Sequence, residues 1–550
     1  MAVIDHVVVL MLENRSFDHM LGFLEHPSPE FDGLRGGGRY ENPGWKGDAA
    51  VPAAPHAKPV LPVGPDHSHE AVMEQVAVKG LGAGARPTNQ GFVTSYERKC
   101  RGLAPATFGG LLSPVLNRMI RRKTGATAPI LGRGGLAMQC QPPEQVPVLS
   151  RLALEFAVCT RWFCSVPGET WPNRNFVHAA TSDGETEIEL RPYTNRTIFE
   201  QLEEQGQSWH VYHDDTPQLW AFPRLWDTAD RHANWFPSTR FVDHVAAGEL
   251  PAYSFIEPNH RPPLHTLDHE PVLGAPSLST SQHPENNPVA NASYDSYVDD
   301  GNTDFARAES LIAMVYEALR TNPEIFQRTL LLITYDEHGG LYDHVPPPVG
   351  VPSPGGEPRA LTRLMRTIWH RKTSAFDFTM LGPRVPAVVV SPYIPAGTVD
   401  TRIHDHASVP ATVRAIFAPN AAPLTARDAW AAPFHSVLTL DRPRGAGELA
   451  DLSAHVDLAA AATAAATAAV TTAPTSAAAA PPPAAPAEVV VPDYYDDFLK
   501  QAGQVQQHLA AVGEPEIAGT GGGPSMDQAA RVSAAFAVAA KRHRQGTEPR

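Results

Sequence analysis

The chain has 550 residues, of which 43% are hydrophobic and 19% are charged. These proportions exclude a disordered chain and are typical of a globular protein with a large buried core. The formal net charge of −15 argues against broad nucleic-acid binding, because phosphate backbones favour basic surfaces. The four cysteines are too few for a disulfide scaffold at this length, and none stands in a C-x-x-C pair, so a thiol-based zinc site is not expected.

The N-terminus enters an apolar run directly, without a basic segment, apolar core and cleavage site ahead of it. A classical secretory signal is therefore not expected. Nor does any stretch reach the roughly 18 strongly apolar residues that a membrane-spanning helix requires. These observations leave the localisation open: the protein is expected to be cytoplasmic, already processed, or exported by a route that needs no leader.

Apolar runs that alternate with helical and loop stretches predict the fold class. The expected strands lie at residues 3–12, 153–159, 329–335 and 385–391, and a helix is expected from Leu311 to Arg320. Near-continuous apolar strands that alternate with helices indicate an α/β protein with a mostly parallel central sheet covered on both faces.

Composition also suggests how the chain is divided. We expect a catalytic domain over 1–455, with long inserted cap segments at about 26–150 and 181–303. Residues 456–488 are rich in Ala, Thr and Pro, which is typical of a linker. Residues 489–550 are expected to form a helical or partly disordered tail.

Two short polar segments each follow a predicted strand directly. Glu13 and Asn14 come after the first run, and Asp336 and Glu337 come after the run at 329–335. Alone, each has a local explanation: Asn14 as a helix cap, and the second segment as a turn. Together they place carboxylate and amide oxygens where open α/β sheets bind ligands. Adjacent buried carboxylates repel unless a cation balances them, so we predict one divalent metal ion, whose identity the sequence does not give.

The segment from Ser165 to Arg174 (SVPGETWPNR) offers a hydroxyl group at a predicted helix start. Pro172 suits the first helical turn, which makes Thr170 the expected N-cap. Thr170 could simply cap this helix. It could instead attack phosphorus, with the helix N-terminus holding phosphate oxygens and a metal activating the hydroxyl.

Histidine is plentiful, with 24 residues, and it clusters in the expected loops. Any one of these histidines is more often structural than catalytic. A phosphoryl-transfer site would nonetheless need histidines to neutralise phosphate oxygens and to protonate the leaving alkoxide.

Five motifs in order then carry a resemblance: ENRSFDH, SVPGETWPNR, TYDEHGGLYDHVPPP, VPAVVVSPYIP and DHASVPAT. Over roughly residues 1–420 the chain resembles the bacterial phosphoesterase family, which contains phosphatidylcholine-type phospholipases C, plant non-specific phospholipases C and acid phosphatases. The resemblance implies an alkaline-phosphatase-like α/β fold and hydrolysis through a covalent phospho-enzyme.

The resemblance also implies roles for individual residues. The metal ligands would be Glu13, Asn14, Asp336 and Glu337. The nucleophile would be Thr170. The catalytic histidines would be His67, His283 and His406. An acidic, Asn-rich stretch after His283 departs from the family pattern and leaves His260 and His265 as competitors. Asn173, His338 and His344 would support the site or contact the substrate.

The preferred function is a metal-assisted phospholipase C that acts on phospholipid head groups through Thr170. An acid phosphatase on phosphomonoesters and a catalytically inactive metal-binding interaction protein are the alternatives. The stretch from Leu111 to Arg122 could rest on an anionic membrane surface, although core packing is the preferred explanation. No nucleic-acid partner is expected, and the sequence does not indicate an oligomeric state.

Overall fold

The computed structural model describes residues 4–35, 40–77, 86–103, 130–188, 193–213, 217–225, 228–260, 265–266, 279–286, 289, 291–299, 301, 303–355, 376–456 and 489–490. Nearly all of the predicted linker and tail, and the stretch 111–122, lie outside the described residues. Within the described part of the chain, no helix is both long and apolar enough to cross a bilayer.

An eight-stranded sheet with the order β12-β4-β11-β10-β1-β8-β6-β7 forms the centre of the molecule. Its strands are β1 (His6–Leu12), β4 (Ala157–Cys159), β6 (Trp209–Tyr212), β7 (Trp235–Phe236), β8 (Tyr253–Ile256), β10 (Thr329–Tyr335), β11 (Ala387–Val390) and β12 (Thr398–Asp400). β11 runs antiparallel to β10 and β4, whereas the other described neighbours pair in parallel. β1, β4, β10 and β12 therefore all end at the same edge of the sheet.

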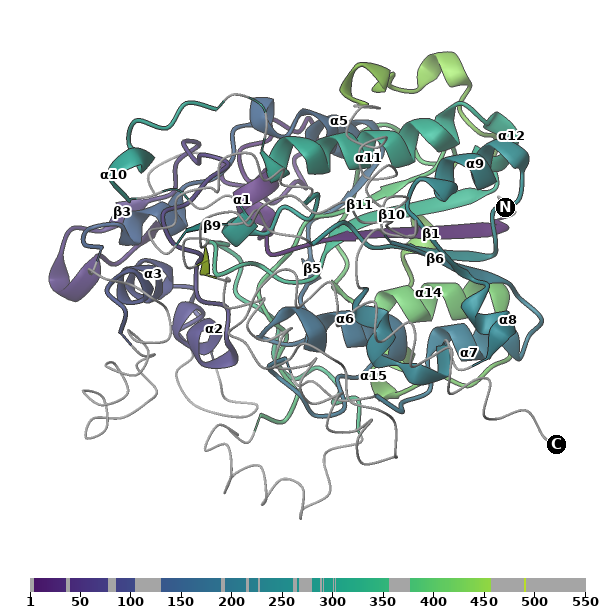
Figure 1. Cartoon of the computed structure of the whole chain (residues 1–550), viewed down its shortest axis with the longest axis horizontal. Helices are drawn as coiled ribbons and strands as arrows, with labels where there is room; N and C mark the ends of the chain where they lie inside the picture. Colours follow the sequence, from purple (N-terminus) through teal and green to yellow (C-terminus); the bar gives the residue numbers. More distant parts are fainter. Residues whose placement is uncertain are drawn as a thin grey trace, which may run out of the picture.

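Helices cover both faces of this sheet (Figure 1). On one face lie α5 (Pro147–Glu155), α9 (Arg240–Ala247), α11 (Asp304–Arg320) and α12 (Pro323–Phe326). On the other lie α6 (Thr170–Ala179), α7 (Ile198–Glu203), α14 (Ser408–Phe417) and α15 (Ala426–Trp430). With helices on both sides, β1 and β10 are almost wholly buried, which explains why their sequences are continuously apolar instead of alternating.

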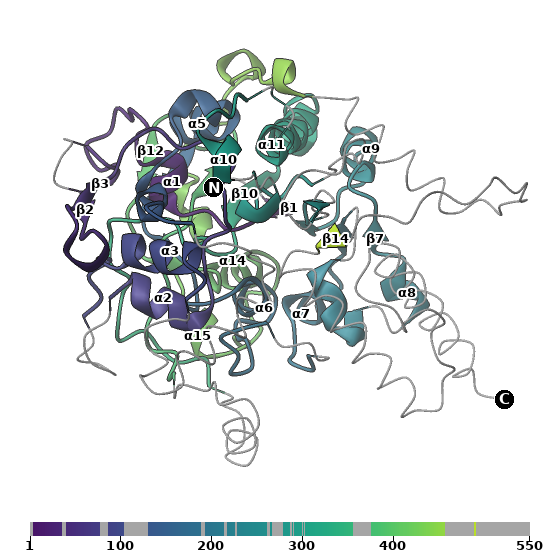
Figure 2. The ribbon, with the colours of Figure 1, turned by 60° about the vertical axis from the view of Figure 1, so that its left-hand side comes forward.

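The inserted segment after β1 gathers beyond the carboxyl end of that strand. Here α1 (Phe17–Leu21), α2 (His69–Gln75) and α3 (Phe92–Cys100) lie together, with the short strands β2 (Glu41–Asn42) and β3 (Val51–Pro52) nearby (Figures 1 and 2). Smaller described elements are α8 (Ala229–His232), α10 (Asn291–Tyr294), β5 (Trp162–Phe163), β13 (His404–Asp405), and the pair β9 (His265–Thr266) and β14 (Val489–Val490).

The predicted strands at 3–12, 329–335 and 385–391 are present with small differences at their ends. The prediction of one strand over 153–159 was wrong. Residues up to Glu155 belong to α5, because Val148, Leu149 and Leu152 are buried at helical spacing, and the strand is confined to Ala157–Cys159. The predicted helix from 311 begins earlier, at Asp304, where the Thr303 hydroxyl accepts a hydrogen bond from Ala306 N at 3.2 Å.

Candidate active site

The ends of β1 and β10 lie side by side. These strands pair in parallel from His6 opposite Thr329 to Leu12 opposite Tyr335, so the polar residues that follow emerge together. The pairing continues past the strands, because Asp336 N donates to Leu12 O at 3.1 Å and Asn14 N donates to Asp336 Oδ1 at 3.0 Å. The register thus brings the two polar segments to one place at the sheet edge.

A glycine keeps the second segment folded against the first. Gly339 has a φ of +65°, and a Cβ atom there would lie 2.0 Å from the carbonyl oxygen of Asn14. Asn14 itself occupies the left-handed region, with a φ of 56°. Any larger residue at position 339 would push the two strand ends apart.

Thr170 faces the same point from the start of α6. It is the first helical residue and Glu169 is the N-cap, so the prediction that Thr170 caps the helix was wrong by one position. Its Oγ1 lies 3.5 Å from Asn14 Oδ1. Asn173 fixes the preceding turn, because its amide accepts from Val166 N at 3.0 Å and donates to the Val166 and Glu169 carbonyls, each at 3.1 Å.

Arg174 is the buried cation of the site, and the sequence analysis gave it no role. Its Nε donates to Asp336 Oδ2 at 3.1 Å, and its guanidinium lies 3.8 Å from Glu13 and 3.7 Å from Glu257. Its side chain has no exposed surface. The spacing in the sequence could have indicated this role, because Arg174 follows Thr170 by four residues and both therefore lie on one face of α6.

The carboxylates outnumber the cations around them, and this shifts their protonation. Burial, with the adjacent Asp336, raises the pKa of Glu13 to about 7, although His260 and Arg174 oppose the shift. Burial and Asp336 likewise raise the pKa of Glu337 to about 8, although His67 opposes it. A divalent cation would reverse both shifts, because it favours the charged carboxylates.

The donor set fits a metal ion. Glu13 Oε1 and Glu337 Oε1 are buried and accept no hydrogen bond within the described part of the chain. Carboxylate and amide oxygens are ligands of hard divalent cations. Among the described residues, Glu13, Asp336 and Glu337 do not form a group whose ligand atoms all lie within 4.8 Å of one another, so one shared ion requires a side-chain rotation.

Two of the predicted catalytic histidines lie beside these carboxylates. The side-chain amide of Asn14 lies 2.9 Å from His283 Nε2, and the rings of His283 and His67 meet edge to face with centroids 5.7 Å apart. Burial, with the neighbouring His67, lowers the pKa of His283 well below its usual value. The competitor His260 also lies here, with Nε2 3.5 Å from Glu13 Oε1. Of the other competitor, His265, the structure describes the backbone of β9 only.

Two further predicted histidines contact the second strand end. His406 Nδ1 accepts from Trp162 Nε1 at 3.2 Å, and its Nε2 donates to the backbone carbonyl of Asp336 at 2.6 Å. His338 Nε2 donates to Gln75 Oε1 at 2.7 Å and so ties the strand end to α2. Both ring nitrogens of His406 are therefore engaged by the protein.

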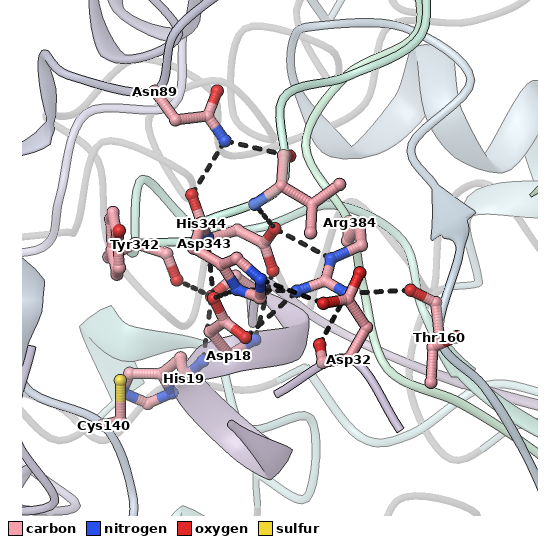
Figure 3. Close-up of polar contacts among 12 residues, drawn as sticks. Asp18, His19, Asp32, Asn89, Cys140, Thr160, Tyr342, Asp343, His344 and Arg384 are labelled. Carbon is pink, nitrogen blue, oxygen red and sulfur yellow. Dashed lines mark hydrogen bonds and ion pairs between the residues drawn. The ribbon is translucent and has the colours of Figure 1, made fainter. Parts of the chain in front are cut away.

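His344 belongs to a separate ionic cluster, which Figure 3 shows. Its Nδ1 lies 2.6 Å from Asp18 Oδ2, and its Nε2 lies 3.2 Å from Asp32 Oδ1. Burial works against the charged ring, but the carboxylates of Asp18 and Asp32 raise the pKa of His344 to about 9. Arg384 bridges Asp343 at 2.8 Å and Asp18 at 3.0 Å (Figure 3). Protein cations therefore neutralise this cluster, which joins α1 to the segment after β10.

Comparison of the sequence with known proteins assigns the chain to a family. The sequence profile of the phosphoesterase family matches residues 4–418. The chain belongs to the phosphoesterase family. Its predicted membership and its predicted class, a phosphoric ester hydrolase, are thus confirmed, and the sheet order confirms the α/β fold with a mostly parallel central sheet.

Curated relatives of this phosphoesterase carry phospholipase names. Non-specific phospholipase C3 of Arabidopsis thaliana is 33% identical over 458 residues, which cover 80% of this chain and 74% of that protein. Phospholipase C A of Mycobacterium tuberculosis is 26% identical over 453 residues, covering 75% of this chain and 73% of that one. Non-hemolytic phospholipase C of Pseudomonas aeruginosa is 28% identical over 431 residues, covering 74% and 53%.

Two of the solved structures that match illustrate a distant likeness. A protein of the alkaline phosphatase superfamily from Vibrio parahaemolyticus has a TM-score of 0.28 and 9% identity, over 54% of this chain and 64% of that one. Phosphonate monoester hydrolase of Agrobacterium radiobacter has a TM-score of 0.26 and 14% identity, over 49% and 68%. At these scores the likeness carries no weight, and the fold rests on the sheet itself.

Proposed function

We propose that this phosphoesterase is a phospholipase C that cleaves phosphodiester head groups from phospholipids, with Thr170 as its nucleophile. One observation carries the proposal: Thr170 Oγ1 lies 3.5 Å from Asn14 Oδ1, at the sheet edge where the acidic segments meet. The phospholipase names of the relatives support the choice of substrate class.

The position of Thr170 at the start of α6 supports its role as the nucleophile. The first N–H groups of a helix have no acceptor within the helix, and they favour an anion such as a phosphate group. Asn173 holds the preceding turn in shape through its hydrogen bonds to Val166 and Glu169. The nucleophile and the anion-binding amides are therefore fixed relative to each other.

Glu13, Asn14, Asp336 and Glu337 would hold one divalent metal ion. When bound, such an ion supplies charge neutralisation and lowers the pKa of a coordinated hydroxyl group. Arg174 keeps the Asp336 carboxylate oriented through its contact of 3.1 Å. His406 holds the backbone of the same residue, so we assign it a positioning role in place of the catalytic role predicted from the sequence.

The reaction then has two displacement steps. His283 or His67 takes the proton of the Thr170 hydroxyl as Oγ1 attacks phosphorus, the bond from phosphorus to the glycerol oxygen breaks, and the same ring passes that proton to the glycerol oxygen. Water next gives a proton to the ring and attacks phosphorus, the bond from phosphorus to Thr170 Oγ1 breaks, and the ring returns the proton to Oγ1, which releases the phosphorylated head group and restores Thr170. His283 suits proton transfer because it sits beside Asn14, and His67 lies against its ring.

The test compares Thr170→Ala, Thr170→Ser and the wild type on p-nitrophenyl phosphorylcholine. Thr170→Ala should lower turnover by at least about 10³-fold, because the covalent step is lost. Thr170→Ser keeps the hydroxyl and should retain measurable activity. Near-normal hydrolysis by folded Thr170→Ala would eliminate Thr170 as the nucleophile.

Substrate choice separates the proposal from its alternatives. The wild type should prefer phosphatidylcholine and p-nitrophenyl phosphorylcholine to p-nitrophenyl phosphate, and a chelator should abolish the activity. Hydrolysis of the monoester alone would indicate a phosphatase. Metal binding with no hydrolysis of any of these esters would indicate an inactive metal-binding protein.

A further inference from the structure

A second buried cluster of metal-ligating side chains lies at the same edge of the sheet, on β4 and β12, which β11 separates from the candidate active site. It consists of Cys159, Asp400 and His404, whose ligand atoms all lie within 4.8 Å of one another. Each is buried, with exposed fractions of 0%, 6% and 0%. None of them belongs to the residues that the proposed reaction uses.

Strand pairing holds these three residues in place. Cys159 at the end of β4 is the register partner of Asp400 at the end of β12. The next residue continues this pairing, because Thr160 N donates to Asp400 O at 3.0 Å. His404 begins β13, which pairs with β5, and its N donates to Arg161 O at 2.9 Å. The cluster is therefore built on sheet backbone and not on a loop.

The hydrogen bonds of His404 leave one ring nitrogen for a cation. Nδ1 lies 3.0 Å from the Ala432 carbonyl, which can only accept, so Nδ1 carries a hydrogen. In the neutral ring, Nε2 then presents its lone pair to Asp400 Oδ2 at a distance of 3.0 Å. Two lone pairs at this distance repel unless a proton or a metal ion lies between them. A histidine that donates one N–H to a backbone carbonyl and offers its other nitrogen is the usual arrangement of a metal ligand.

We propose that Cys159, Asp400 and His404 form a second metal site, which binds Zn²⁺. Thiolate, imidazole and carboxylate together are the ligand types of zinc, whereas the candidate active site offers oxygen ligands alone. Zn²⁺ would replace the thiol proton of Cys159 and the proton on Nε2 of His404, so the net charge of the cluster stays the same. Solvent would supply the fourth ligand.

Arg402 is the group that zinc must accommodate. Its Nε donates to Asp400 Oδ1 at 2.9 Å, and its Nη2 contacts Oδ2. The Arg402 side chain is 42% exposed, so it can turn outward and open a path to the cluster. It can also keep its bond to Oδ1 while Oδ2 binds the metal.

The proposed zinc site is joined to the candidate active site by stacked rings. The ring of Trp162 lies on that of His404, with centroids 5.2 Å apart and planes 18° apart. Trp162 donates to His406, which in turn donates to the Asp336 carbonyl. Fixing His404 with a metal ion therefore also fixes the ring that supports Asp336.

Cobalt distinguishes the two sites, because only a thiolate ligand gives a near-ultraviolet thiolate-to-cobalt charge-transfer band. Chelator-treated full-length protein titrated with Co²⁺ should develop this band, and Zn²⁺ should remove it by competition. Cys159→Ser should lack the band, whereas the matched variant Cys140→Ser, which removes a buried cysteine elsewhere, should keep it. His404→Gln should weaken Co²⁺ binding at this site by at least about 100-fold, since even outer contacts of a metal site contribute 10–100-fold.

Zinc-edge X-ray absorption of the wild type tests the same proposal without any variant. It should show a sulfur neighbour at about 2.3 Å from the metal. Absence of that neighbour in protein loaded with two equivalents of zinc, absence of the cobalt band, or a band that persists in Cys159→Ser would each overturn the proposal. Loss of phosphoesterase activity plays no part in these readouts, so failure of the proposed function cannot produce the same result.

Discussion

Arg174→Gln is the substitution that most sharply tests the electrostatics of the candidate active site. The guanidinium lies 3.1 Å from Asp336, 3.8 Å from Glu13 and 3.7 Å from Glu257, and all four side chains are buried. Removing one partner of a buried ion pair costs about 3–5 kcal/mol of unfolding free energy, because the remaining charges lose their compensation. With an m-value of about 3 kcal/mol/M, the urea midpoint should fall by about 1–1.7 M.

This loss should depend on pH and on metal. It should be larger at about pH 9 than at about pH 6, because the raised pKa values of Glu13 and Glu337, about 7 and about 8, let protons replace the missing cation at the lower pH. Excess divalent metal should bring the urea midpoint of Arg174→Gln closer to that of the wild type, because the ion balances the same carboxylates.

The assay is urea unfolding followed by intrinsic fluorescence, with and without metal. Arg240→Gln is the matched control: its pair with Asp243 is exposed, so its loss should cost at most about 1 kcal/mol. Equal urea midpoints for Arg174→Gln and the wild type without metal would refute the reasoning. A difference in urea midpoint that stays the same after metal is added would refute it as well.

Three further predictions follow from the described contacts. Gly339→Ala should lose both stability and activity. Gly350→Ala is the control: Gly350 has a φ of +78° but no neighbour within 4 Å, so the substitution should cost only about 1–2 kcal/mol of conformational strain. Equal urea midpoints for the two variants would contradict this prediction. The pKa values of Glu13 and Glu337 are raised in the folded chain, so the stability of the metal-free protein should fall as pH rises from 4.5 to about 8. Calorimetry should also detect protons released on metal binding below about pH 7. Metal binding without proton release would contradict this prediction. The pKa of His344 is raised from 6.5 to about 9, so the stabilisation by the charged ring is complete below pH 6.5 and is lost by about pH 9. In metal-saturated protein, His344→Gln should reduce the fall in stability between these two pH values. An unchanged fall would count against the assignment.

The sequence was sufficient to predict the centre of the sheet and the meeting of its two polar strand ends. Continuous apolar runs mark β1 and β10 as buried parallel strands, and parallel strands end at one edge. The register is the part that periodicity does not supply. It follows from the whole packed sheet, and it determines that Asn14 N reaches Asp336 Oδ1.

The predicted bounds of elements were wrong where the local sequence suits two structures. The run at 153–159 is apolar enough for a strand, yet its first residues also continue the buried face of α5. Thr170 was expected one position too early in its helix, because Glu169 can equally well precede the first turn. Both errors are errors of boundary, where the tertiary structure decides between competing local preferences.

Groupings that do not follow from two adjacent strand ends were beyond the sequence. Arg174 lies next to Glu257 because of how α6 packs on the sheet, and nothing in their spacing indicates it. The same holds for Cys159, Asp400 and His404, which come from three strands. The absence of C-x-x-C spacing excludes only local thiol sites, and it carries no information about ligands that the sheet brings together.

The central claim is that Thr170 carries the phosphoryl group during turnover. The most direct measurement is mass spectrometry of peptides from protein quenched in acid during hydrolysis of p-nitrophenyl phosphorylcholine. The account predicts a phosphocholine adduct on the peptide that contains Thr170, located on that residue and absent from Thr170→Ala. An adduct on a different residue, or steady turnover with no adduct at Thr170, would contradict it.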